Sequence, residues 1–118
     1  MKPIPEMSRL ELAAYISTQL KKHNIYVVLS GGSCVSIYSN DQYVSLDLDF
    51  VNAGFAKREK ICAVMAGLGF HEKRRYFWHK DISLLVEFPP GPLGVGNEPV
   101  KEVVEIQTDT GVLLSVTK

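Results

Sequence analysis

The sequence predicts an α+β protein with a mixed β-sheet flanked by helices. Segments with helical and strand patterns alternate along most of the chain, and two strand patterns joined by a turn close it. The 118 residues are 46% hydrophobic and 22% charged, and 13 basic residues balance 13 acidic ones. This length and composition are typical of a globular domain with one core. We therefore expect a single domain over residues 1–118.

Composition also argues against several classes of protein. The apolar runs are far shorter than the ~20 residues of a membrane span, and the N-terminus lacks the apolar stretch of a signal peptide. A formal net charge of zero argues against binding of long duplex DNA, which needs a wide basic face. Cys34 and Cys62 form no metal or disulfide framework, and each is interpreted as a small buried residue in a reducing compartment. We expect a cytoplasmic protein.

Three segments have the signals of helices. Ser8 and Glu11 form a capping box at the start of the first, and Asn24 is its expected stop. The second opens directly after a Gly-Gly-Ser turn. The third places apolar residues at helical spacing and is followed by Gly69, a typical C-terminal cap. The helices are expected at residues 8–23, 33–38 and 56–68.

Six segments have the patterns of strands. The first is a continuous apolar run, as expected of a strand covered on both faces, and the second alternates between two faces. Tight turns near Lys80 and at residues 108–111 join two hairpins, with Gly111 supplying positive φ in the latter. Prolines at residues 89–92 exclude regular structure there. The strands are expected at residues 25–29, 43–51, 75–79, 82–88, 101–107 and 112–117.

Two aspartates stand out on the second strand. Asp47 and Asp49 are two residues apart, so both project from one face with Cα atoms ~6.6 Å apart, while Leu48 and Phe50 hold the register in the core. Carboxylates this close repel each other unless a cation lies between them, and Mg²⁺ prefers such oxygen ligands. The pair predicts a Mg²⁺ or Mn²⁺ site. The alternative is a pair of aspartates on the solvated face of an edge strand.

Gly31, Gly32 and Ser33 lie between the first strand and the second helix. Backbone N–H groups at a helix N-terminus bind phosphate, and glycine lets a ligand approach the backbone closely. The Ser33 hydroxyl either caps the helix or binds phosphate, and the alternative for all three is a plain turn. Because the acidic pair follows on a strand expected to lie alongside, the two features together predict a metal-bridged triphosphate site.

The segments Leu29-Ser-Gly-Gly-Ser33 and Asp47-Leu-Asp49 resemble the signature of the nucleotidyltransferase superfamily: a hydrophobic strand, Gly-Gly or Gly-Ser, and then Asp-x-Asp or Asp-x-Glu. The likeness is greatest to small bacterial nucleotidyltransferases of the abortive-infection and toxin–antitoxin types, and covers about residues 8–90. It implies the nucleotidyltransferase fold and Mg²⁺-dependent transfer of a nucleoside monophosphate from a nucleoside triphosphate such as ATP to an acceptor hydroxyl. It also implies that the two aspartates hold the metal and that Gly31, Gly32 and Ser33 bind the nucleotide phosphates.

The resemblance further implies a third carboxylate on a later strand, which helps to activate the acceptor. Glu87 is favoured as this catalytic and metal-binding residue, because it lies inside an apolar run. An ionised side chain there is unfavourable unless it is paired or binds a metal ion. Asp81, at the preceding turn, and Glu105 are alternatives, as is the absence of a third carboxylate. A glutamate here departs from the aspartate that is usual in the family.

Residues 71–80 gather four Lys or Arg, two His and three aromatic side chains. On a strand, alternate side chains face opposite sides. One side is expected to reach the triphosphate or an RNA acceptor, with an aromatic ring stacked on a base. Arg74 and Arg75 are the candidate nucleotide-binding residues. The alternative is a solvated edge strand that buries its aromatic side chains.

A second hypothesis is a non-catalytic or partner-dependent nucleotide-binding module of the same fold, for example one half of a toxin–antitoxin pair. Larger members of such families add C-terminal helices that hold the base and the acceptor. We expect these helices to follow in a longer chain or to come from a helical partner protein. The preferred nucleotide and the acceptor (RNA, protein or small molecule) stay open. A third hypothesis is an α+β domain whose aspartates only decorate its surface.

Overall fold

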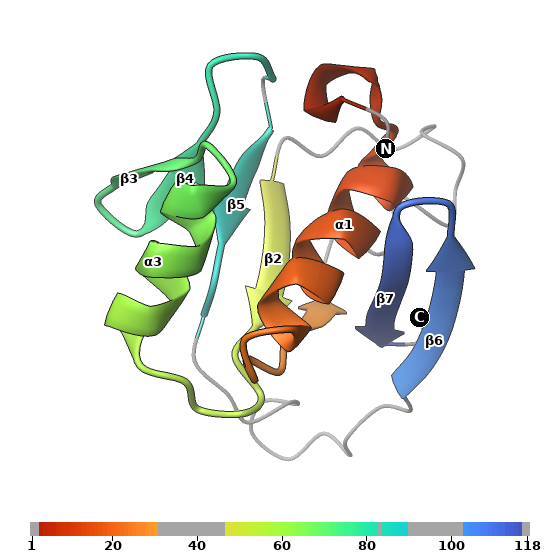
Figure 1. Ribbon diagram of the computed structural model, residues 1–118. Helices are drawn as coiled ribbons and strands as arrows, with labels where there is room; N and C mark the ends of the chain where they lie inside the picture. Colours follow the sequence, from red (N-terminus) through yellow and green to blue (C-terminus); the bar gives the residue numbers. More distant parts are fainter. Residues whose placement is uncertain (1–2, 31–46, 83, 90–102, 117–118) are drawn as a thin grey trace.

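A seven-stranded sheet with two α-helices on one side forms the part of the chain that the computed structural model describes, residues 3–30, 47–82, 84–89 and 103–116 (Figure 1). Its elements in chain order are the 3-10 helix η1 (Ile4–Glu6), α1 (Arg9–Lys21), β1 (Val28–Ser30), β2 (Asp47–Val51), α3 (Arg58–Gly67), β3 (His71–Lys73), β4 (Tyr76–Trp78), β5 (Leu85–Glu87), β6 (Val103–Thr108) and β7 (Gly111–Val116). The predicted helix at 33–38, the first part of the predicted strand at 43–51 and most of the proline-rich segment lie outside the described residues.

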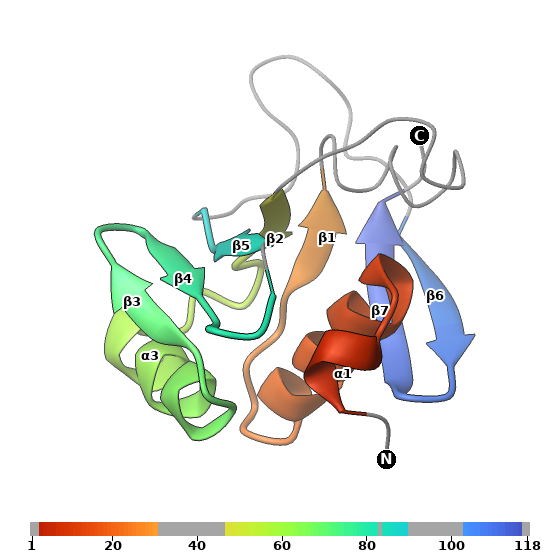
Figure 2. The same ribbon diagram turned by 90° about the horizontal axis from the view of Figure 1, so that it is seen from above.

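The strands form one mixed sheet in the order β3-β4-β5-β2-β1-β7-β6. Strand β2 pairs antiparallel with β1 and parallel with β5, and β7 pairs parallel with β1. Both α-helices lie on the same side of this sheet, α1 over β7 and β6 and α3 beside β3 (Figure 2). The prediction of an α+β fold with a mixed sheet is confirmed. Within the described residues, no helix is both long and apolar enough to cross a bilayer.

Helix α1 begins where the sequence predicts. The Ser8 hydroxyl accepts from the Glu11 N–H (3.1 Å), and the Glu11 carboxylate accepts from the Ser8 N–H (3.0 Å), so the capping box is confirmed. The helix ends at Lys21, and Asn24 adopts a left-handed conformation at φ 63°. Its inner face buries five apolar side chains against the sheet, namely those of Leu12, Ala13, Ala14, Ile16 and Leu20.

The core lies between the sheet and the two helices. Leu48 and Phe50 of β2 are fully buried, which confirms the predicted alternation over the described part of that strand. Phe50 stacks on Phe88 with ring centroids 5.8 Å apart, and Phe77 meets Phe88 edge-on at 5.5 Å. These contacts join the central strand β2 to β4 and to the residue after β5, so the register between them is fixed by aromatic packing.

Several elements are shorter than predicted, among them β5, which covers Leu85–Glu87 instead of residues 82–88. Strand β1 covers only Val28–Ser30, although Ile25 and Val27 before it are also buried. Helix α3 begins at Arg58, two residues later than predicted. Gly69 follows it at φ 94°, which confirms the predicted C-terminal cap. Cys62, predicted to be buried, is only half-buried on α3.

Strand β3 is absent from the sequence prediction. Its three residues, His71–Lys73, are all exposed, so no alternation marks them, and they form a strand because they pair with β4. The chain turns between these strands at Arg74 and Arg75, with Arg74 at φ 59°. The prediction that Arg75 begins a strand is therefore wrong. The second turn, at Lys80 and Asp81, lies where the sequence predicts.

The closing hairpin is confirmed, with a shorter turn than predicted. Strands β6 and β7 pair antiparallel from Val103↔Val116 to Thr108↔Gly111, and Gly111 has a φ of 147°. The hairpin also packs on α1, because the Thr110 hydroxyl donates to the Glu11 carbonyl at 2.6 Å. This contact holds the turn of the hairpin against α1.

Candidate functional site

Three polar side chains occupy matching positions on neighbouring strands. Asp49 of β2 pairs in register with Glu87 of β5, and Glu87 pairs with Tyr76 of β4. The residues that precede them or follow them along these strands, including Leu48, Val86 and Phe77, are buried in the core on the helix side. Because side chains alternate along a strand, Asp49, Glu87 and Tyr76 project from the side of the sheet opposite α1 and α3.

Asp49 and Glu87, which we call the carboxylate pair, lie on adjacent parallel strands. Cα atoms in this arrangement are about 4.8 Å apart. Asp49 and Glu87 are both half-buried, and the Oδ1 atom of Asp49 is shielded from solvent. Asp47 precedes Asp49 by two residues on β2 and is in register with Leu85 of β5. Two of the three predicted acidic residues thus come together as direct neighbours, and the third belongs to the same strand.

The phosphate-binding candidates Gly31, Gly32 and Ser33 lie outside the described residues. The strand that leads into them is described, and its last residue, Ser30, is the Cα partner of Asp49. The chain therefore enters the Gly-Gly-Ser segment directly beside the carboxylate pair. The sequence predicted that these two features lie on neighbouring strands, and the pairing of β1 with β2 confirms it.

Glu87 is the candidate third carboxylate that lies closest to the aspartates in the sheet. Asp81 belongs to the turn before β5, four residues ahead of the position in register with Asp47, and its carboxylate lies 3.9 Å from Nδ1 of His79. Glu105 belongs to β6, and strands β7 and β1 separate it from β2. Neither alternative is a neighbour of Asp49 in the sheet.

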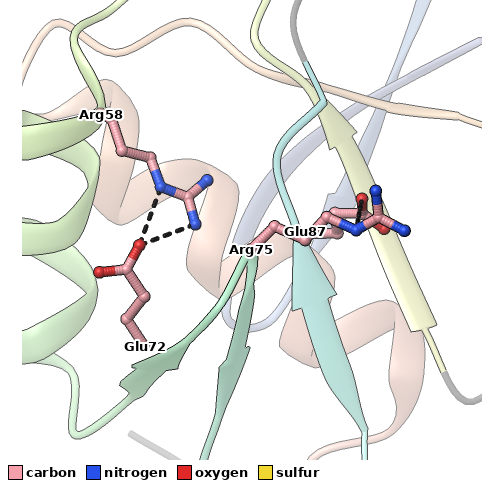
Figure 3. Close-up of polar contacts among 4 residues, drawn as sticks. All are labelled: Arg58, Glu72, Arg75 and Glu87. Carbon is pink, nitrogen blue, oxygen red and sulfur yellow. Dashed lines mark hydrogen bonds and ion pairs between the residues drawn. The ribbon is translucent and has the colours of Figure 1, made fainter.

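Arg75 forms an ion pair with Glu87 across the β4–β5 pair (Figure 3). Its Nε atom lies 3.3 Å from Oε1 of Glu87, and the arginine side chain is 72% exposed while that of Glu87 is 22% exposed. The guanidinium carbon also lies 5.5 Å from the centroid of the Tyr76 ring. The hydrogen bond to Tyr76 and the charge of Glu87 raise the pKa of Arg75 above its ordinary value. This ion pair was not predicted from the sequence.

A second ion pair lies on the helix side and is separate from the carboxylate pair. Arg58 of α3 donates from Nε and Nη2 to one oxygen of Glu72 on β3, at 3.1 and 3.0 Å (Figure 3). The same guanidinium lies 4.9 Å from the centroid of the buried Phe77 ring. These contacts fasten α3 to the β3–β4 hairpin, so we interpret them as structural.

The donor set of the carboxylate pair suits a hard divalent cation. Carboxylate oxygens are the ligands that Mg²⁺ takes from proteins, with waters or phosphate oxygens completing its shell. Within the described residues, no group of three or more His, Cys, Asp or Glu is close enough to hold a metal ion. The residues that fit Mg²⁺ are therefore Asp49 and Glu87, with Asp47 as the remaining candidate on the same strand.

An open depression lies beside the carboxylate pair on the same side of the sheet. It has a volume of about 540 Å³ and is lined by Lys73, Arg74, Tyr76, Trp78 and Leu85. Tyr76 thus borders both Glu87 and the depression. The two predicted arginines separate here, since Arg74 lines the depression whereas Arg75 contacts Glu87.

Comparison with known proteins gives no match: no protein-family model fits the chain, and neither a curated protein nor a solved structure is significantly similar to it. The nucleotidyltransferase resemblance therefore stays a prediction that rests on the two sequence motifs.

Proposed function

We propose that this chain is a Mg²⁺-dependent nucleotidyltransferase that moves a nucleoside monophosphate from a nucleoside triphosphate to an acceptor hydroxyl. The single observation that carries the proposal is the register of three strands. It brings Asp49 beside Glu87 and puts the end of β1, where Gly-Gly-Ser begins, beside Asp49. A phosphate-binding turn and paired carboxylates at one place are what metal-assisted phosphoryl chemistry needs. The nucleotidyltransferase fold is part of the same proposal.

Each residue has a specific task in this reaction. Asp47 and Asp49 would hold Mg²⁺, which when bound would lower the pKa of the acceptor hydroxyl and neutralise charge on the leaving phosphates. Gly31, Gly32 and Ser33 bind the triphosphate through backbone N–H groups and a hydroxyl. Glu87 would either hold the metal on the acceptor side or take the proton from the acceptor hydroxyl as a general base. The acceptor oxygen then bonds to the α-phosphorus, the bond to the β-phosphate oxygen breaks, and pyrophosphate leaves.

Arg75 controls the charge of this site. While its guanidinium lies 3.3 Å from Glu87, that carboxylate is neutralised without a metal. The Arg75 side chain is highly exposed, so it could turn from Glu87 to the triphosphate, which would leave this carboxylate available to a metal ion. This exchange keeps the local charge balanced before and after the substrate binds.

The same ion pair favours a second candidate, a non-catalytic nucleotide-binding module. In such a module, Arg75 would stay on Glu87 permanently, and the triphosphate would bind without transfer. Calorimetry with ATP or GTP and Mg²⁺ separates the two candidates when it is combined with a transfer assay. Saturable, metal-dependent binding without any labelled product supports the module, and binding with a labelled product supports the enzyme.

The transfer assay incubates the protein with each labelled nucleoside triphosphate, Mg²⁺, total tRNA and cell extract, and asks which species takes the label. We expect Asp49→Asn and Glu87→Gln to lower the rate by about 10²–10⁴-fold, as for loss of a catalytic carboxylate. Glu105→Gln is the matched control, because it makes the same change in charge on β6, which two strands separate from β2. Circular dichroism and thermal unfolding verify that all three variants fold. Equal rates in the three variants would contradict the proposal.

A further inference from the structure

The depression beside the carboxylate pair combines two features that the proposed reaction does not use. One is an exposed aromatic ring: Trp78 is 40% exposed, although its strand β4 has a paired strand on each side. The other is a pair of cationic side chains, Lys73 and Arg74, at the turn between β3 and β4. An exposed tryptophan next to two cations is a surface feature that core packing does not explain.

The Trp78 ring is supported from one side. Its centroid lies 4.7 Å from that of His71 on the neighbouring strand, with the two planes inclined at 35°. His71 and Trp78 are cross-strand partners, so this contact follows from the register of β3 and β4. The indole ring is therefore held in place by a contact within the hairpin while it lines the depression. A planar ring fixed in this way is suited to stacking on another flat ring.

The cationic side chains of Lys73 and Arg74 have no acidic partner among the described residues. Arg58 is paired with Glu72, and Arg75 is paired with Glu87, but neither Lys73 nor Arg74 forms an ion pair with another described residue. Arg74 also holds a positive φ of 59°, a conformation that favours glycine or asparagine. The two-residue turn between β3 and β4 requires such a conformation, and it places the Arg74 side chain at the depression.

We propose that this depression binds a single-stranded polynucleotide, with one base stacked on Trp78 and the neighbouring phosphates on Lys73 and Arg74. Aromatic rings combined with a small basic surface recognise single strands, because unpaired bases expose their faces for stacking. A volume of about 540 Å³ is in the range of ~300–1,000 Å³ of small-ligand sites. The net charge of zero fits a short single strand better than a long duplex.

The depression reaches the residue next to the carboxylate pair. Tyr76 lines it and is the cross-strand partner of Glu87, so a chain that stacks on Trp78 would reach the carboxylate pair if it extends along β4 past Tyr76. The terminal hydroxyl of a polynucleotide held there is the acceptor of the proposed reaction. This assignment as acceptor rests on the proposed function, whereas the binding of a single strand does not.

The test measures binding without Mg²⁺ or nucleoside triphosphate, so that it does not depend on catalysis. Trp78 is the only tryptophan of the chain, and its fluorescence reports directly on stacking. We expect saturable quenching by an eight-nucleotide single-stranded RNA or DNA, whose relative affinities show whether the 2′-hydroxyl contributes. An RNA duplex of the same length is expected to bind more weakly. Quenching by the duplex at equal concentration, or no quenching by either single strand, would overturn the proposal.

Variants assign the binding to the depression, with a labelled oligonucleotide and fluorescence anisotropy as the readout. In Lys73→Gln/Arg74→Asn, asparagine tolerates the positive φ, and we expect the slope of log affinity against log salt to fall by about 1.4, or 0.7 for each lost phosphate contact. Trp78→Leu is expected to weaken binding about tenfold, within the range for loss of one stacked base. Lys22→Gln/Lys60→Gln removes the same charge from two exposed positions, the C-cap of α1 and the first turn of α3, and should have little effect.

The outcomes separate the two proposals. If the oligonucleotide binds and the variants behave as expected but no label is ever transferred, the proposed function fails and this inference stands. If the control variant weakens binding as much as Lys73→Gln/Arg74→Asn, the depression is not the binding site and the inference fails. Tight binding of an unstructured peptide but not of the oligonucleotides would likewise overturn it in favour of a protein partner.

Discussion

A single hydroxyl joins helix α1 to the closing hairpin. The Thr18 Oγ1 atom accepts from the Val112 N–H at 2.8 Å and donates to the Val112 carbonyl at 3.2 Å. Strand β1 pairs with β7 at Ser115, three residues further along, so it does not reach Val112. The Thr18 hydroxyl therefore satisfies two backbone groups of β7 that β1 leaves without a strand partner. We predict that this bridge is a main determinant of how the hairpin docks.

The substitution Thr18→Val tests this because it keeps the shape of the side chain and removes both hydrogen bonds. Each bond contributes about 1 kcal/mol net, and a buried N–H left without a partner costs about 1–3 kcal/mol more. Since Thr18 and Val112 are only half-buried, we take the lower part of this range and expect a loss of about 2 kcal/mol. For a chain of this size, that loss lowers the melting temperature by about 8 °C.

The assay is urea unfolding followed by the fluorescence of Trp78, with thermal unfolding as a second measurement. Thr18→Ser is the matched control, because it keeps the hydroxyl and removes only a methyl group. We expect the midpoint of the Thr18→Val transition to fall with no change in its denaturant slope, which would mark a loss of stability rather than a change in compactness. If the two variants differ by less than about 0.5 kcal/mol, the bridge contributes no more than one weak hydrogen bond, and the reasoning is refuted.

The remaining predictions concern helix ends and one thiol. Gly67→Ala, where no atom crowds a new Cβ, should stabilise the protein by up to about 1 kcal/mol, whereas Gly69→Ala, at φ 94°, should cost about 1–2 kcal/mol. Thermal unfolding measures both, and shifts of the same sign would contradict this. Ser8→Ala removes the capping box and should cost about 1 kcal/mol, while Ser8→Asn, which also caps, should not; equal losses in urea unfolding would argue against the cap. Burial, and then the Glu72 carboxylate, raises the pKa of the Cys62 thiol. The thiol is therefore more protonated at pH 8 than an ordinary cysteine, and Glu72→Gln should speed its alkylation by iodoacetamide, measured by mass spectrometry of its peptide; unchanged rates would refute the effect of Glu72.

Elements whose cause is local could be predicted from the sequence. The capping box at Ser8 and Glu11 needs residues three positions apart, and both of its hydrogen bonds are present. Gly69 and Gly111 mark a helix end and a tight turn, because each requires a backbone conformation that other residues rarely adopt. In these cases, the residues that cause the structure are neighbours along the chain.

Elements that depend on distant partners could not be predicted. Strand β3 has three exposed residues and forms a strand only because it pairs with β4. The parallel pairing of β7 with β1, at Leu29↔Ser115, joins segments at opposite ends of the chain, and no local pattern marks it. Single-sequence patterns report which face of a strand is buried, but they do not report which strand lies next to it.

In the candidate site, too, locally determined features could be predicted from the sequence and features that depend on distant strands could not. The apolar run around Glu87 singled it out, and the structure makes it the in-register neighbour of Asp49. The ion pair between Arg75 and Glu87 depends on the turn at Arg74, which follows from the unpredicted strand β3. Because that turn also sends Arg74 to the depression, the two arginines that the sequence treated together take separate positions.

The order of the strands predicts that the hairpin carrying Arg75 opens locally more easily than the strands carrying Asp49 and Glu87. Asp49 and Glu87 belong to strands with neighbours on both sides, whereas Arg75 precedes a three-residue strand whose outer neighbour, β3, ends the described sheet. Opening of the edge hairpin costs less free energy than global unfolding, so amide hydrogen exchange should be faster in β3 and β4 than in β2. Such an opening withdraws Arg75 from Glu87 while the carboxylates keep their register. The protein can thus expose the charge of its acidic site through a fluctuation at one edge, without disturbing the strands that hold the site in place.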